Sequence, residues 1–492
     1  LPRDAHHQLV ITMTTTTLVA LVACVLIVIY GVALAWQHRR YPGEPPVLFS
    51  WVPFLGSALD LAKDPYLFVR SQRRKLGEVF VAHVAGQRMV FVCDQVAARK
   101  CLARADLSFA AVIDKIHVKA LAMLPEEAKV FPNADIHRQY TEFLLKDSSL
   151  NELSRKASDR IDAIIQRDKA KYTTSTTLDL YEDVVKKIIF EASVDVMFGP
   201  GLAKVLDVET LGRLADDFDT DFPKMVAGVR PSKGTRARSV LAKLFLEASY
   251  EDGASAFVRA RLAMFRAMAK EGTIQAWDKK TDHRLPMQVA SEIGLLFGIV
   301  TNTMPAAFWT VYYLIRLNDA SFLAAVRHEV RANPADPDAW PHLESAVTEA
   351  FRLAWGGFHT RDTIKAGSQI PNTTYHLRLG DRVTLFPTLV HVDDGHFPDP
   401  LTFNPYRFLT DNDKKINKKS DINVFGGGVS MCPGRRFAQR EIKMCAAKLL
   451  HHFDITLQDP KTLLPGALIS QGAGRGMYPP NSSVPVALSY RA

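Results

Sequence analysis

The chain has 492 residues, and its 61 Lys and Arg exceed its 52 Asp and Glu, which gives a formal net charge of +9 at pH 7. This mild excess comes without a basic run interleaved with aromatic residues, so it argues against nucleic-acid binding and fits a membrane surface or an acidic protein partner better. The five cysteines are too scattered for a disulfide framework, and no CxxC or HExxH motif supports a zinc site.

Residues 18–36 form an apolar run with no charged residue. A helix of this length reaches about 28 Å, enough to cross the hydrocarbon layer of a bilayer. Basic residues follow at 38–40, on the flank expected to be cytosolic. A cleaved signal peptide is the alternative, but its basic residues would precede the apolar run. We therefore predict an N-terminal segment, residues 1–40, with an uncleaved single-pass span at 18–36, and a folded domain over residues 41–492.

Beyond the anchor, the pattern indicates a mainly α-helical domain with small β-sheets. The proline-rich residues 41–46 predict a stiff spacer that leads the chain away from the bilayer. Residues 64–75 predict a short helix, and residues 79–84 and 88–92 predict a β-hairpin. A mostly helical period then continues to residue 355, and strand patterns return later. The predicted helix breaks are at residues 132, 199–201, 230–235 and 333–341, and the predicted late strands are residues 382–386 and 484–489.

A long, largely apolar helix is predicted over residues 291–317, with an interruption by Asn302, Thr303 and Pro305. Pro305 cannot donate a hydrogen bond to the carbonyl of Thr301, so the helix should bend there. Polar side chains beside an opened turn make a small notch in which dioxygen and an ordered water could bind. The alternative is a kinked core helix whose threonine hydroxyl bonds back to a carbonyl one turn earlier.

Glu349 and Arg352 place opposite charges three residues apart on one predicted helix face. Such a pair is common on solvated helices and is weak evidence alone. It gains weight from the downstream segment 403–408, because Arg407 in that segment could join the pair in a buried charge network.

Residues 425–434 carry a lone cysteine, Cys432, in a glycine-rich turn that precedes a predicted helix over residues 435–453. The glycines let the backbone pass close under a flat ligand, and Pro433 can begin the helix. The positive end of the helix dipole favours a deprotonated sulfur, which suits a thiolate bound to one metal ion. A thiolate is also the ligand that pushes electron density into haem iron. A buried free cysteine is the alternative.

This stretch resembles the haem-cysteine loop of the cytochromes P-450, whose pattern Phe-x-x-Gly-x-Arg-x-Cys-x-Gly is met by Phe425, Gly428, Cys432 and Gly434. The departure is Ser430, where most of the superfamily has an Arg or His that reaches a haem propionate. The resemblance implies the cytochrome P-450 fold over a haem-thiolate catalytic domain, haem b as cofactor, and Cys432 as the axial ligand of the iron.

The same resemblance implies roles for residues outside the loop. Asn302 and Thr303 stand where the oxygen-binding helix of the family has an acid followed by threonine, so both become candidate catalytic residues. Glu349, Arg352 and Arg407 would form a structural network. Arg361 would contact a haem propionate, in compensation for the missing basic residue at position 430.

The segment from Asn302 to Trp309 and Ser430 are similar to the branch that contains the sterol 7α- and 12α-hydroxylases and prostacyclin synthase. Residues 222–229 resemble the loop between two lid helices of that branch, and residues 472–480 resemble its C-terminal turn, whose tip enters the substrate cavity. The resemblance therefore implies a sterol-like substrate.

We expect a monooxygenase at the cytosolic face of the endoplasmic reticulum membrane. Electrons would come indirectly from NADPH through NADPH-cytochrome P-450 reductase, with cytochrome b5 as a further donor, and a lysine cluster before the cysteine loop would help to bind an acidic donor. Two alternatives stay open. One is a reductase-independent isomerase of a lipid peroxide, and the other is a non-catalytic membrane protein that binds haem or sterol. The lysines of the cluster are Lys414, Lys415, Lys418 and Lys419.

Overall fold

The structure is a computed structural model that describes residues 3–175, 177–202, 204–247, 251–272, 284–411, 414–415, 422–459 and 476–491, with side chains described from residue 17 onward and not for 410–421. The predicted residues Lys418 and Lys419, and 472–475 of the C-terminal turn, lie outside these ranges. Lys414 and Lys415 form the short strand β8, which pairs with β7 (Thr410–Asp411).

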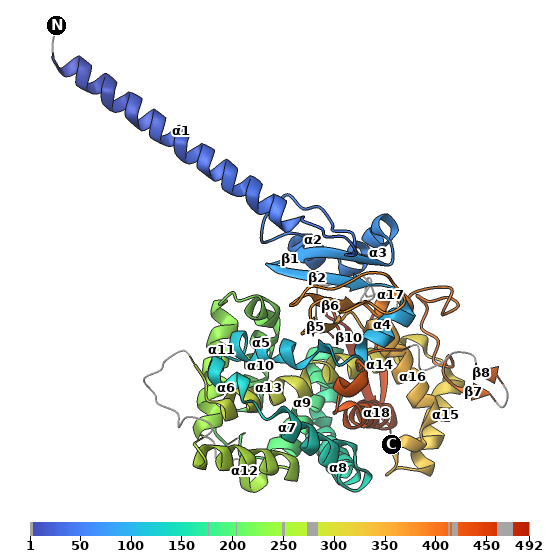
Figure 1. The fold of residues 1–492 in the computed structure, drawn as a ribbon. Helices are drawn as coiled ribbons and strands as arrows, with labels where there is room; N and C mark the ends of the chain where they lie inside the picture. The colour runs from blue at the N-terminus through green and yellow to red at the C-terminus, as the bar shows by residue number, and fades with distance from the viewer. Residues whose placement is uncertain are drawn as a thin grey trace.

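A single long helix, α1 (Arg3–Gln37), projects from the body of the molecule (Figure 1). Its segment Thr17–Gln37 has a mean hydropathy of 3.0, and its apolar run is exposed, whereas Gln37 at its end is buried. The predicted span at 18–36 therefore lies in a helix long and apolar enough to cross a membrane. The segment Met287–Leu317 is also long and apolar, but 67% of it is buried, which marks a core helix.

The chain returns to the end of α1 before it enters the body. The amide of Phe54 donates to Gln37 Oε1 (3.1 Å), the amide of Ser50 donates to His38 Nε2 (2.9 Å), and the hydroxyl of Tyr30 donates to the carbonyl of Trp51 (2.5 Å). The predicted spacer therefore does not lead straight away from the membrane, because hydrogen bonds hold residues 50–54 beside the last turns of α1.

Within the described residues, the largest sheet has the strand order β1-β2-β6-β5-β3, and a second sheet has the order β4-β10-β9. The predicted hairpin is confirmed, with Val79 opposite Val92 and a turn at Ala85 and Gly86. The strands are β1 (Val79–Val84), β2 (Gln87–Val92), β3 (Leu107–Ser108), β4 (Leu178–Asp179), β5 (His359–Thr363), β6 (Arg382–Leu385), β9 (Phe453–Leu457) and β10 (Pro485–Tyr490).

The rest of the body is mainly helical, which confirms the predicted fold class. The helices after α1 are α2 (Ala58–Lys63), α3 (Pro65–Leu76), α4 (Gln95–Leu102), α5 (Ala110–Lys119), α6 (Pro125–Lys129), α7 (Asn133–Tyr140), α8 (Asp147–Thr174), α9 (Lys186–Phe198), α10 (Val208–Val226), α11 (Ser232–Glu247), α12 (Ala256–Lys270), α13 (Met287–Val300), α14 (Thr303–Leu317), α15 (Ala320–Ala332), α16 (Pro341–Ala354), α17 (Thr388–His391) and α18 (Arg435–His452).

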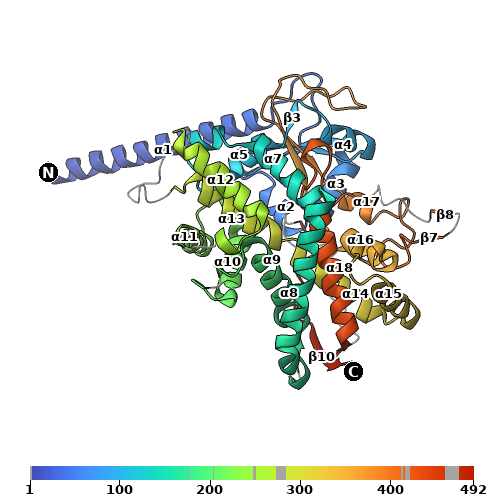
Figure 2. The ribbon, with the colours of Figure 1, turned by 90° about the horizontal axis from the view of Figure 1, so that it is seen from below.

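Four helices, α8, α14, α16 and α18, form the centre of the body. Helix α18 packs against α8 and α14, and α14 packs against α16 (Figure 2). The side chains between them are large and apolar, as shown by the fully buried Trp309 and Tyr312 on α14. This packing holds the two segments that flank the cavity described below, the N-terminal ends of α14 and α18, at fixed positions.

Two predicted boundaries are wrong. Residues 222–226 are not part of a loop, because the amphipathic period of α10 continues through Phe222 and ends only at Val226. The helix that follows the cysteine loop begins at Arg435 and ends at His452, so Phe453 starts β9 instead of closing the helix. Pro433 therefore lies in the turn before α18 and does not begin the helix.

Candidate functional site

A cavity of about 400 Å³ lies between the cysteine loop, the break between α13 and α14, and strand β5. Cys432, Thr303 and Arg361 all line it, although they are far apart in sequence. The remaining walls are mostly apolar, a composition typical of sites for small lipophilic ligands. The apolar lining includes Leu144, Ile299, Ala306, Phe351, Ile442 and Met477.

Cys432 is held by the backbone of its own loop. Its amide donates to the carbonyl of Phe425 (2.8 Å), and the ring of Phe425 packs edge-on against Phe351 on α16. Burial raises the pKa of the Cys432 thiol, while the backbone N–H groups of Gly434 and Arg435, at the start of α18, act in the opposite direction. The helix terminus thus favours the thiolate, but burial outweighs it until a positive partner is present.

The glycines of the loop serve a contact that the sequence did not indicate. Gly428 has φ +64°, and a Cβ there would lie 2.2 Å from the carbonyl oxygen of Leu102, at the end of α4. A Cβ on Gly427 would lie 2.9 Å from the Leu102 side chain. These two glycines let the loop approach α4, whereas Gly426 and Gly434 have no such close neighbour.

Arg361 is a buried cation at the edge of the cavity. It donates to the carbonyls of Thr360 (2.9 Å) and Gly427 (3.0 Å), and its guanidinium lies 5.1 Å from the centre of the Phe109 ring. Burial lowers its pKa to about 10, and no acidic side chain among the described residues pairs with it. A buried charge without a partner is costly, so this position fits the anionic group of a ligand.

His359 shares the cavity with Arg361 and was missed by the sequence analysis. Its Nε2 bonds the carbonyl of Asn423 (2.9 Å), and burial lowers its pKa to about 4, which keeps the ring neutral. A Cβ on Gly426 would lie 3.9 Å from His359 Nδ1, so this nitrogen faces the cysteine loop. Strand alternation places residues 359 and 361 on the same face, so the expected position of Arg361 at the haem would have indicated His359 as well.

The predicted break in the long helix falls at Thr301 and Asn302, one turn before Pro305. Thr303 is buried and lines the cavity, and no other described group bonds its hydroxyl. The back-bonded alternative is realised at Thr310 instead, whose hydroxyl donates to the carbonyl of Ala306 (2.8 Å). Asn302 also lines the cavity, but its Oδ1 accepts a hydrogen bond from the amide of Met477 (2.8 Å).

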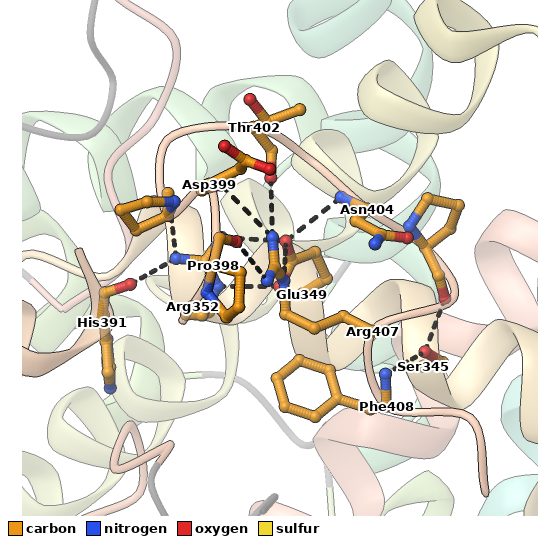
Figure 3. Close-up of polar contacts among 12 residues, drawn as sticks. Ser345, Glu349, Arg352, His391, Pro398, Asp399, Thr402, Asn404, Arg407 and Phe408 are labelled. Carbon is orange, nitrogen blue, oxygen red and sulfur yellow. Dashed lines mark hydrogen bonds and ion pairs between the residues drawn. The ribbon is translucent and has the colours of Figure 1, made fainter. Parts of the chain in front are cut away.

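Glu349, Arg352 and Arg407 form one buried charge network (Figure 3). Arg352 donates twice to the Glu349 carboxylate, each time at 2.8 Å, and Arg407 Nε donates to Oε1 at 2.9 Å. The remaining guanidinium N–H groups bind backbone carbonyls, which lie on the segment that leads to Arg407. Those carbonyls belong to His391, Pro398, Asp399, Pro400 and Thr402.

A sequence model of the cytochrome P450 family matches residues 45–475. Cholesterol 7-alpha-monooxygenase of Cricetulus griseus is 27% identical over 510 aligned residues, which cover 94% of this chain and 96% of the relative. The 7-alpha-hydroxycholest-4-en-3-one 12-alpha-hydroxylase of Homo sapiens is 28% identical over 469 aligned residues, which cover 87% of this chain and 89% of the relative.

Among solved structures, a retinoic acid bound cyanobacterial CYP120A1 is similar, with a TM-score of 0.65 and 20% sequence identity over 91% of this chain and 99% of that one. At this identity the likeness shows the fold. A cavity that joins a lone cysteine to a broken helix and a buried cation is typical of haem-thiolate enzymes. The chain belongs to the cytochrome P450 family and is a cytochrome P450 monooxygenase.

Membership in this family implies a haem iron, and the residues of the cavity fit one. The Cys432 sulfur lines the cavity beside backbone N–H groups that favour the thiolate. Arg361 supplies a buried positive charge with no acid of its own among the described residues. A thiolate donor and an anion-seeking cation in one largely apolar cavity match the iron and the propionates of a haem.

Proposed function

We propose that this protein is a membrane-anchored sterol monooxygenase. The observation that carries the proposal is the placement of Cys432 and the unpaired cation of Arg361 in one apolar cavity. Thiolate-bound haem iron supplies the activation of dioxygen when it is bound. The protein contributes binding, orientation and control of protons.

Cys432 would hold the iron, and Arg361 would neutralise a propionate. Phe425 supports this arrangement, because its carbonyl fixes the Cys432 amide. Gly428 lets the loop approach Leu102, and Gly434 donates its N–H toward the sulfur.

The hydroxyl of Thr303 lies at the break of the helix and faces the cavity without a described partner. A free hydroxyl in that position could hold an ordered water and relay a proton within the cavity. Asn302 stands beside it and has its own oxygen occupied, so Thr303 is the better candidate for proton handling.

The network of Glu349, Arg352 and Arg407 has a structural role in this proposal. None of the three lines the cavity, and together they fix the segment between β6 and the cysteine loop. We divide the chain into an anchor segment, residues 1–40, and a haem-thiolate catalytic domain, residues 41–492. All of these residues lie in the catalytic domain.

The sterol assignment is supported by the two relatives named above, which act on cholesterol and on 7-alpha-hydroxycholest-4-en-3-one, and by the apolar walls of the cavity. A rigid, largely hydrocarbon substrate with few polar groups suits such walls.

The apolar helix that ends at Gln37 supports attachment to a membrane. The basic residues after it support a cytosolic catalytic domain, and we propose the endoplasmic reticulum as the membrane. An NADPH-cytochrome P-450 reductase would then deliver the electrons, with cytochrome b5 as a further donor. The turn before Cys432 exposes the apolar side chains of Val429 and Met431, which offer a face on which a donor protein could dock near the sulfur.

The first test is the absorption spectrum of the reduced protein with carbon monoxide. We expect a thiolate-type band in the wild-type protein and its loss in Cys432→Ala. A panel of sterols is then titrated to find those that displace water from the iron, and each is assayed with NADPH and reductase. Turnover of a lipid hydroperoxide without reductase, with no NADPH-dependent sterol product, would show an isomerase instead. A haem protein with no thiolate band would contradict the proposal.

A further inference from the structure

Within the described part of the C-terminal turn, the segment Gly476–Tyr478 forms part of the cavity wall through Met477. Its backbone pairs with the chain that follows α16. The amide of Gly356 donates to the carbonyl of Gly476 (2.9 Å), and the amide of Tyr478 donates to the carbonyl of Ala354 (3.3 Å). These bonds leave the Met477 amide pointing away from the α16 side, toward α14.

Two side chains associated with α14 bind the turn from the opposite side. Asn302, the residue that precedes the helix, accepts a hydrogen bond from the Met477 amide at 2.8 Å. Trp309 donates its ring N–H to the carbonyl of Tyr478 at 2.6 Å. Residues seven apart share one helix face, so the two side chains form a single row of contacts with the C-terminal turn.

The fit between Asn302 and the turn is close. A Cβ on Gly476 would lie 2.1 Å from Asn302 Oδ1, and the backbone of Gly476 is outside the left-handed region. The side-chain contact, and not the backbone conformation, therefore excludes a larger residue. The Met477 amide also fixes which end of the carboxamide is oxygen, so only the NH₂ group of Asn302 remains for the cavity.

We propose that Asn302 is a positioning residue, which holds the C-terminal turn in place and thereby sets the shape of the substrate cavity. What the site requires at this position is a hydrogen-bond acceptor of the right length. An amide provides that acceptor without adding a charge to an apolar cavity, and it leaves proton handling to Thr303. The inference rests on the proposed function only for the identity of the substrate used to read it out.

The first experiment measures hydrogen–deuterium exchange of the full-length holoprotein at the peptide that contains the Met477 amide. Asn302→Ala removes the acceptor, so we expect exchange there to become about tenfold faster. Asn302→Asp keeps an acceptor oxygen and should stay within about threefold of the wild-type rate. Equal acceleration in both variants would overturn the proposal, because it would show that the acceptor is not what matters.

The second experiment is a double-mutant cycle between Asn302→Ala and Gly476→Ala, read by the dissociation constant of the best sterol from its spectral titration. Each single variant should weaken sterol binding by about tenfold, the first by releasing the turn and the second by displacing it. Once Asn302 is Ala, the closest contact of the added methyl is removed and only the Trp355 ring, 3.1 Å away, remains to adjust, so the double variant should be weakened little further. Multiplicative losses, or an unaltered dissociation constant in Asn302→Ala, would overturn the proposal.

Gly212→Ala on α10 is the matched control for adding a methyl group, because a Cβ there lies 3.8 Å from the nearest Phe190 atom. It should leave sterol binding unchanged. The KM of Asn302→Ala for the sterol should rise, whereas its kcat at saturating sterol should change less. A wild-type protein without the thiolate spectrum would contradict the proposed function. Hydrogen–deuterium exchange at the Met477 amide would still test the role of Asn302.

Discussion

Arg407 and Glu349 lie 58 residues apart in sequence and are joined by a buried hydrogen bond of 2.9 Å between Nε and Oε1. The carboxylate also binds Arg352 and accepts a bond from the Asn404 amide (3.1 Å). One anion therefore holds two guanidinium groups and the backbone of the segment that precedes the cysteine loop.

Glu349→Gln should be strongly destabilising, because it leaves two buried cations without their anion. We expect a loss of about 3–5 kcal/mol in the free energy of unfolding and a low yield of haem-containing protein. Denaturant titration and the haem-to-protein ratio measure both effects. Glu209→Gln is the control, since Glu209 forms an exposed pair with Arg213 and should change stability by at most about 0.5 kcal/mol. Similar small losses in both variants would contradict a buried structural network.

Arg361→Gln should weaken haem retention without a matching loss of fold. The cation has no acidic partner among the described residues, so its removal should change the unfolding free energy of the haem-free protein little. A haem propionate, in contrast, would lose a charged hydrogen bond. We expect the equilibrium constant for haem transfer to a competing acceptor to be about 10–100-fold larger than for the wild-type protein. Arg361→Lys should recover part of the difference. Unchanged transfer in Arg361→Gln would show that the propionates lie elsewhere.

Thr303→Ala should lower the amount of sterol product formed per NADPH consumed, because the free hydroxyl at the helix break no longer holds a proton donor near the oxygen. A loss of about 10²-fold in proton transfer is typical of a removed general acid, so most electrons would then be wasted. Thr303→Ser should retain coupling. Thr310→Ala, whose hydroxyl is occupied by the carbonyl of Ala306, serves as the control on the same helix. Full coupling in Thr303→Ala would remove this residue from the mechanism.

The stability of the protein should fall in mild acid, and His117 should account for part of the fall. Burial lowers the pKa of His117 to about 4 from its usual 6.5, and its ring packs 4.3 Å from that of Phe131. The unfolded chain thus binds a proton below pH 6.5 that the folded protein accepts only near pH 4. The contribution of the neutral His117 to the free energy of unfolding is fully present above this window. It decreases as pH falls through the window, by about 2 kcal/mol between pH 7 and pH 5.

His117→Phe should remove this proton uptake. The slope of unfolding free energy against pH, measured by denaturant titration between pH 5 and 7, should decrease by an amount close to one proton. The buried His359 and His391 still titrate in the variant, so a residual slope is expected. An identical slope in the two proteins would show that His117 binds its proton equally well in the folded and unfolded states.

Local patterns predicted the anchor, the hairpin and the helix break, because each depends on residues close together in sequence. The pairing of Glu349 with Arg407 was also expected, since both stand in recognisable motifs. The contact of Gly428 with Leu102 could not be predicted, because it depends on how distant segments pack. The bond from Met477 to Asn302 is of the same kind and changes the interpretation of Asn302.

The junction between α1 and the body has a mechanical consequence. Both ring nitrogens of His38 are engaged, since Nδ1 donates to the Leu34 carbonyl (2.8 Å) and Nε2 accepts from Ser50. The exposed rings of Trp51 (70% accessible) and Phe54 (69% accessible) stand beside the same helix end. These contacts join the end of the helix to the body. A bilayer of different thickness changes the tilt of a membrane-spanning helix, and the orientation of the catalytic body at the lipid surface would change with it.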